Sequence, residues 1–224
     1  MIPAPAILLR GLALVALLVA WAVLAHQGSS GNGNPDVSVA LAMAPFLALA
    51  VILLWRVGNP LWIAVGGLAV VGVLAWFWPE LRQNVAKLFY VQHLGTNLAL
   101  AALFGRTLFG NHEALVTQFA KLAHGGVISS AKTRYTRQVT IAWSIFFVAN
   151  ALVSTALFWL ASPAAWSIFA NLLSTPLLGL MFVIEHLCRY YILPPGDRSS
   201  VADTIRAYRA SSALKRSETL PKQS

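Results

Sequence analysis

Long apolar segments with few or no internal charges constrain this chain more than any other feature. Because an α-helix rises 1.5 Å per residue, about 20 such residues cross the roughly 30 Å of hydrocarbon in a bilayer. Hydrophobic residues make up 58% of the chain and charged residues only 10%, which exceeds what a water-soluble core could bury. Lipid offers no partner to an unpaired backbone amide, so the spanning segments must be helices. The sequence therefore predicts an all-α, polytopic transmembrane helix bundle.

The prediction is six spans, at residues 5–25, 37–55, 60–78, 88–109, 139–160 and 163–187. A bundle of five spans is the alternative, because the fourth segment includes several polar residues. A cleaved signal peptide is the alternative for the first segment, although signal cores are usually shorter. The last two spans are separated only by the letters "ASP" and require a very tight hairpin. Residues 1–193 are thus one predicted membrane domain, followed by a basic tail at residues 194–224.

The positive charges flank the apolar segments. The formal net charge is +9, but the basic residues are not concentrated in a soluble domain with a nucleic-acid-binding motif. We therefore expect anionic lipid headgroups as partners, and no nucleic acid. The cations around the last two spans include Lys121, Lys132, Arg134, Arg137 and the basic residues of the tail. They predict a cytoplasmic C-terminus. Six spans then place the N-terminus inside, with Arg82 and Lys87 as exceptions, whereas five spans place it outside.

Two segments have the pattern of short amphipathic helices at the membrane surface. In the first, Asn111 is a candidate N-cap, and Leu115, Phe119 and Leu122 share one helical face. In the tail, Val201, Ile205 and Tyr208 form a similar apolar stripe. Such helices commonly lie on anionic lipid, and an ordinary solvated segment is the alternative for the tail.

The predicted fourth span contains three polar candidates. His93 and Asn97 are four residues apart and share a helical face, so they can hydrogen-bond to each other or to another helix. A structural bond between helices is favoured over a proton relay. Arg106 stands near the end of the span, from which its long side chain can reach the headgroups. The sequence favours a cytoplasmic anchor over an anion-binding role for Arg106.

The last two predicted spans carry a seam of polar residues. At about 100° per residue, Asn171, Ser174 and Glu185 fall in one narrow sector, which we expect to face the fourth or fifth span. Arg189 follows Glu185 by four residues, a favourable order for a helical ion pair. The fifth span has a shorter seam of the same kind, formed by Asn150 and Ser154.

No catalytic set is recognisable in the sequence. Cys188 is the only cysteine, which excludes an intrachain disulfide and a cysteine-rich metal site. Metalloprotease, nucleophile-elbow and phosphate-loop motifs are also missing. The sequence predicts no metal and no cofactor, and it favours a non-catalytic protein over an enzyme.

From residue 87 onward, an ordered set of motifs resembles a family of uncharacterised bacterial inner-membrane proteins. The motifs are "LFGRTL", "RYTRQVTIAW", "FFVANALVS", "WSIFANLL" and "EHLCRYY". Members of that family are often encoded in gene clusters for aryl polyene and xanthomonadin-type pigments, beside acyl carrier proteins, ketosynthases, acyltransferases and glycosyltransferases. The motif residues carried over are Arg106, Arg134, Tyr135, Arg137, Trp143, Asn171, Glu185 and Arg189. A looser similarity is to the intracellular septation protein A family.

The resemblance implies a multi-pass protein of the bacterial inner membrane that assists synthesis or export of a lipid-linked acyl product. A transporter or flippase with the polar seams along its path is the alternative, and an integral acyl-handling enzyme is the third reading. Arg106, Lys132, Arg134 and Arg137 form a predicted basic rim on the cytoplasmic surface. Its expected partner is anionic, either a lipid headgroup, an acyl carrier protein or another membrane protein.

Overall fold

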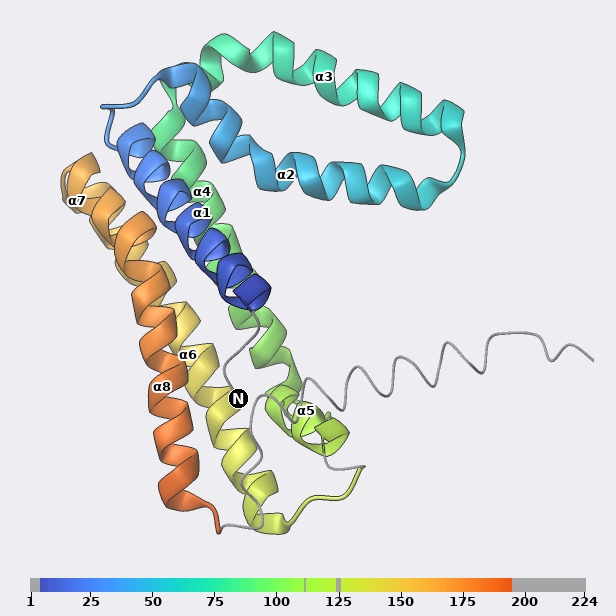
Figure 1. The fold of residues 1–224 in the computed structure, drawn as a ribbon, viewed down its shortest axis with the longest axis vertical. Helices are drawn as coiled ribbons and strands as arrows, with labels where there is room; N and C mark the ends of the chain where they lie inside the picture. Colours follow the sequence, from blue (N-terminus) through green and yellow to red (C-terminus); the bar gives the residue numbers. More distant parts are fainter. Residues whose placement is uncertain (1–4, 111, 124–125, 195–224) are drawn as a thin grey trace, which may run out of the picture. The chain divides into compact units, whose positions relative to one another are not determined.

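The computed structural model describes residues 5–110, 112–123 and 126–194, and every regular element in these ranges is helical (Figure 1). The elements are α1 (Pro5–Ser29), α2 (Pro35–Val57), α3 (Pro60–Gln83), α4 (Val85–Gly105), the short 3-10 helix η1 (Arg106–Leu108), α5 (Leu115–Ala123), α6 (Ser130–Leu160), α7 (Pro163–Ser167), the π-helical segment η2 (Ile168–Leu173) and α8 (Ser174–Ile192). The predicted tail from residue 195 onward and Asn111 lie outside the described residues.

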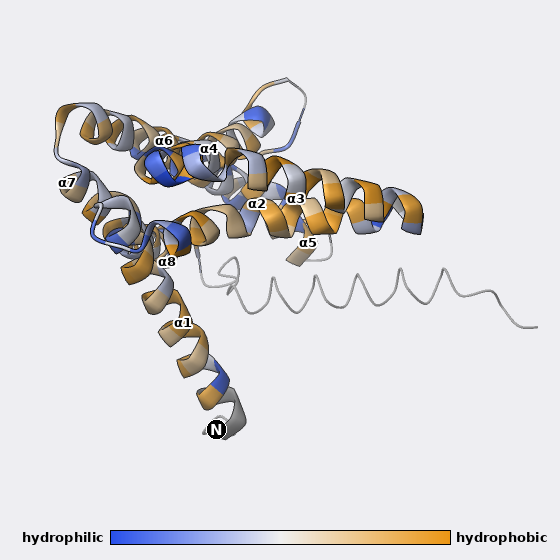
Figure 2. Ribbon diagram, turned by 90° about the horizontal axis from the view of Figure 1, so that it is seen from above, coloured by the Kyte–Doolittle hydropathy of each residue, from blue (hydrophilic) through white to orange (hydrophobic). Residues whose placement is uncertain are grey.

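Five helical stretches are long and apolar enough to cross a membrane, which confirms the all-α, multi-span prediction. They are Leu9–Ser29, Pro35–Arg56, Pro60–Gln83, Ser130–Leu160 and Pro163–Ile192. The predicted fourth span is also a continuous helix, α4, but it does not belong to this apolar set because of its polar residues. Figure 2 shows the hydrophobic character of most of α2 and α3.

Local capping explains why α2 and α3 form an antiparallel hairpin. The Asn34 side chain accepts hydrogen bonds from the amides of Asp36 and Val37, and Asn59 accepts one from Leu61. A proline occupies the first turn of each helix, where its missing amide costs nothing. Gly58 ends α2 with φ +71°, a left-handed conformation that suits glycine.

Helix α6 begins at Ser130, which corrects the prediction that a loop precedes the fifth span. Lys132, Arg134 and Arg137 therefore lie on the first turns of this helix. The Ser129 hydroxyl accepts a hydrogen bond from the Lys132 amide at 3.1 Å, as an N-cap serine does. The span was predicted to start at residue 139 because apolar residues begin there, and the preceding helical turns are polar.

The chain forms two compact units, and α4, α6 and α8 contribute residues to both. Unit 1 contains Met1–Thr96 and Ala151–Pro176. Its core gathers Ala25, Val39, Ala42, Val85, Phe89, Trp166 and Ala170. Trp166 is at the centre of this core: its ring contacts Tyr90 and Phe158, and its indole N–H donates to the Ser154 hydroxyl at 3.0 Å.

Unit 2 contains Asn97–Asn150 and Leu177–Ser224. Its core gathers Ala101, Tyr135, Val139, Trp143, Phe147 and Leu193, so α4, α6 and the end of α8 meet there. Phe104 of α4 contacts the rings of Trp143 and Phe147 on α6. Helix α5 packs on α6 through Thr117, whose hydroxyl lies 2.7 Å from that of Thr136. The predicted apolar residues Phe119 and Leu122 stay exposed on the other side of α5.

Candidate functional site

A buried polar network in unit 1 joins the end of α1 to the last residue of α7 and to the π-helical segment η2. Ser167 Oγ lies 2.7 Å from His26 Nδ1 and 2.7 Å from Ser29 Oγ. The Asn171 amide donates to Ser29 Oγ at 2.9 Å and to Ser167 Oγ at 3.2 Å. Ser167 is 0% exposed, so its contact with His26 does not present a hydroxyl to a substrate. The network holds α1 against α7 and η2.

Sequence reasoning missed His26, Ser29 and Ser167. Ser29 and Ser167 are 138 residues apart; Ser29 belongs to no motif, and only Asn171 was selected from the "WSIFANLL" motif that also contains Ser167. His26 and Ser29 lie beyond the predicted end of the first span, whereas α1 continues to Ser29. The polar residues that follow residue 25 could have indicated a polar end of the helix, but the same composition also fits a loop.

His93 contacts another helix, in agreement with the structural interpretation of its sequence. Its Nε2 lies 2.9 Å from Ser174 Oγ, and its ring meets Phe169 edge to face. One helical turn earlier, the Tyr90 hydroxyl donates to Thr155 Oγ1 at 3.1 Å. Both contacts lie in unit 1 and join α4 to the last two long helices. In unit 2, Asn97 is buried.

Glu185 is buried in unit 2, with a side chain that is 8% exposed. Arg189 donates to both of its carboxylate oxygens at 2.7 Å, which confirms the expected helical ion pair. The Tyr135 hydroxyl on α6 donates to the Glu185 carbonyl oxygen at 2.9 Å. The Glu185 carboxylate accepts hydrogen bonds from Arg189 of its own helix and from Tyr135 of α6, so this cluster connects α6 and α8.

The predicted polar seam is only partly correct. Ser174 contacts α4 and Glu185 contacts α6, as expected, but Asn171 contacts Ser29 of α1. The three residues fall in one sector only if the helix is a regular α-helix, whereas residues 168–173 are π-helical. A π segment holds an extra residue in its turn, so it rotates the residues after it relative to those before it. In the shorter seam, Ser154 accepts from Trp166, and the Asn150 amide donates to the carbonyl of Phe146.

Three of the four predicted rim residues have exposed side chains in unit 2: Arg106, Arg134 and Arg137. The Arg137 guanidinium donates to the carbonyl of Leu108 at 3.2 Å. Leu108 belongs to the same 3-10 turn as Arg106, so these two arginines lie at the same end of the unit. Lys132 is a correction to the predicted rim, because its side chain is only 2% exposed on the inner face of α6.

Arg82 and Lys87 both have polar partners. In a six-span chain these two basic residues would lie on the non-cytoplasmic side, against the positive-inside rule. Arg82 Nε lies 3.1 Å from Asp36 Oδ1, and the Trp78 indole donates to the same oxygen at 2.8 Å. Lys87 donates to Asn84 Oδ1 at 2.8 Å. The Asp36 carboxylate thus offsets one of the two positive charges and joins the start of α2 to the end of α3.

Comparison with known proteins finds no match: no family model, no curated protein and no solved structure is similar to this chain. Among the residues that the structure describes, no three His, Cys, Asp or Glu side chains form a group able to hold a metal ion. The helices themselves define the class, which is that of a multi-pass membrane protein.

Proposed function

We propose that this chain is an accessory protein of the bacterial inner membrane, without a reaction of its own, that assists synthesis or export of a lipid-linked acyl product. Its basic rim, redefined as Arg106, Arg134 and Arg137, binds an anionic partner at the cytoplasmic surface. The basic tail lies on that same side of the membrane, as the distribution of lysine and arginine indicates.

The observation that carries the proposal is the geometry of the rim. The bond from Arg137 to the Leu108 carbonyl holds α6 against the turn that bears Arg106. No acidic residue is present between Arg82 and Glu113, or between Glu113 and Glu185. Glu113 itself is ion-paired with Lys121. The described part of this surface is therefore cationic, and guanidinium groups form planar, forked contacts with phosphate and carboxylate.

The polar residues inside the helices support a non-catalytic role. The side chains of Ser167, Ser174 and Glu185 bond to α1, α4 and α6 respectively, so they stabilise contacts within the bundle. Hydrogen bonds of this kind are a common means of holding membrane helices together. The resemblance to proteins encoded beside acyl carrier proteins then suggests an acyl carrier protein as the anionic partner, since its acidic surface complements the rim.

Arg106→Lys tests the rim. Lysine keeps the charge but lacks the forked donor geometry, so we expect it to lower product level by about tenfold, the effect of losing one good contact. Arg106→Ala should reduce it at least as far. Product is measured in membranes with the protein quantified by immunoblot, and Arg10→Lys serves as a control at an exposed arginine on another helix.

Full product level with lysine at position 106 would contradict the binding role and leave Arg106 as a topological anchor. Binding of purified acyl carrier protein to detergent-solubilised wild-type protein, followed over a range of salt concentrations, tests the partner separately. Charge-mediated contacts at an exposed surface weaken with added salt, so salt-insensitive binding would argue against the rim.

A further inference from the structure

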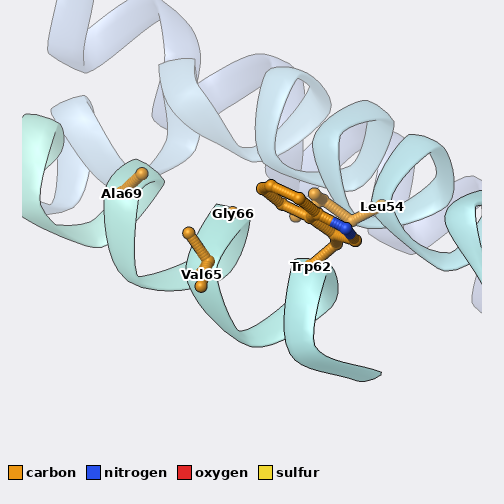
Figure 3. A pocket seen from close by; sticks show the side chains of 5 residues that line it. All are labelled: Leu54, Trp62, Val65, Gly66 and Ala69. Atoms are coloured by element: carbon orange, nitrogen blue, oxygen red, sulfur yellow. The ribbon is translucent and has the colours of Figure 1, made fainter. Parts of the chain in front are cut away.

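A groove in the α2–α3 hairpin has the form of a lipid-chain site. It measures about 490 Å³ and is lined by Leu54 of α2 and by Trp62, Val65, Gly66 and Ala69 of α3. Figure 3 shows these side chains around the gap between the two helices. The four α3 residues occupy positions i, i+3, i+4 and i+7, so they share one helical face. The groove is thus an open apolar surface along this face of α3.

Gly66 gives the groove its floor. A Cβ atom at this position would lie 2.4 Å from Leu54 Cδ2, so a larger residue would push the Leu54 side chain away. The absence of a side chain lets Leu54 pack against the α3 backbone. Trp62 stands in the first turn of α3, where an indole ring suits the boundary between headgroups and hydrocarbon.

The charges of the hairpin indicate which end of the groove receives a headgroup. Between Asp36 and Glu80, the sequence contains one ionisable residue, Arg56. Arg56 is exposed in the last turn of α2, next to the Gly58–Asn59 turn that leads to Trp62. At the opposite end of the hairpin, Asp36 is ion-paired with Arg82. The turn therefore carries a positive charge at the end of the groove that Trp62 marks.

We propose that this groove binds one acyl chain of an anionic phospholipid, whose phosphate group lies at the hairpin turn near Arg56. The apolar walls accept the chain, and the guanidinium group selects a negative headgroup. This inference does not depend on the proposed function, because the groove and the basic rim belong to different units of the chain.

Lipid binding to the whole purified protein tests the site. The protein is titrated in non-ionic detergent with dioleoyl phosphatidylglycerol or dioleoyl phosphatidylcholine, and native mass spectrometry gives the apparent Kd of the first bound lipid. Arg56→Gln should weaken phosphatidylglycerol binding by about fivefold, the effect of one basic residue near a charged surface, and weaken phosphatidylcholine less, because its choline cation already offsets the phosphate charge. Ala69→Phe fills the groove and should weaken both lipids.

Ala64→Phe is the matched control. Ala64 lies five positions before Ala69 on α3, which is about 140° away around the helix and outside the groove lining. It should bind both lipids as the wild type does. The proposal is wrong if Ala69→Phe binds phosphatidylglycerol like wild type, or if Arg56→Gln keeps the wild-type preference for it.

A second measurement uses the wild-type protein, so its result does not depend on whether a variant folds. Phosphatidylglycerol with a photoreactive group on its acyl chain is cross-linked to the wild-type protein, and the labelled peptide is identified. Label within residues 54–69 supports the site. Label concentrated at other helices, with none in this segment, overturns it.

Discussion

The α2–α3 hairpin and helix α6 are both long enough to span a membrane, but they differ in how much of their surface packs against other helices. Helix α3 has no buried residue, and its exposed apolar side chains include Leu68, Val71 and Trp76. Helix α6 buries a stripe of residues spaced by three or four positions, and that stripe includes polar members: Thr136, Thr140, Asn150 and Ser154. The hairpin is suited to contact lipid directly, whereas α6 needs protein partners along its inner face.

The difference shows how polarity and packing are linked in this chain. The hydroxyls of Thr136 and Thr140 donate to their own helix backbone and also meet α5, through Thr117 and the Val116 amide. On a lipid-facing side these hydroxyls would keep the bonds to their own backbone but lose the contacts with α5, each worth about 1 kcal/mol between membrane helices. Polar residues therefore identify the protein-facing sides of the helices.

The largest expected effect comes from breaking the charged contact between α6 and α8. Glu185→Leu removes the carboxylate that Arg189 and Tyr135 contact, so we expect the free energy of unfolding to fall by about 3 kcal/mol. Phe182→Leu, which shortens a half-exposed side chain that packs on Trp143 of α6, should cost less because leucine keeps an apolar contact there. Folded yield and thermal unfolding in detergent compare the two variants. Equal losses would show that Glu185 does not stabilise this contact.

An intermediate effect is expected from the polar network of unit 1. Ser167→Ala deletes the hydroxyl that joins His26, Ser29 and Asn171, and should destabilise the protein by about 1 kcal/mol, within the range measured for membrane helices. Ser144→Ala is the control, because the Ser144 hydroxyl bonds only to Thr140 of its own helix. Thermal unfolding should separate them, and a larger loss at Ser144 would contradict the network's role.

The smallest effect is expected on the hairpin. Leu68 is 74% exposed on α3, so Leu68→Ile should change stability by less than about 0.5 kcal/mol. The same thermal unfolding assay measures it beside the two previous variants. A loss above about 1 kcal/mol would mean that protein, and not lipid, covers this face of α3.

Much of the fold was predictable because the relevant signals are local. Apolar runs of sufficient length predict helices in lipid, and the hairpins at Gly58–Asn59 and residues 161–163 follow from short polar breaks between them. The Glu185–Arg189 ion pair is also local, because a spacing of four residues places both side chains on one helical face. Polar residues delayed the predicted start of α6 because the sequence alone does not distinguish a polar helical turn from a loop.

The sequence by itself determined that this chain is a helical membrane protein, since composition and segment length leave lipid as the only solvent that fits. The tertiary structure decided which polar residues meet. It brought Ser29 to Ser167 and His93 to Ser174, turned Lys132 inward, and sent Asn171 toward α1 through a π-helical segment. Helix periodicity gives the direction of a side chain only relative to its own axis. The partner depends on which helices pack together and on shifts in helical register, and both are set by the packing of the whole unit.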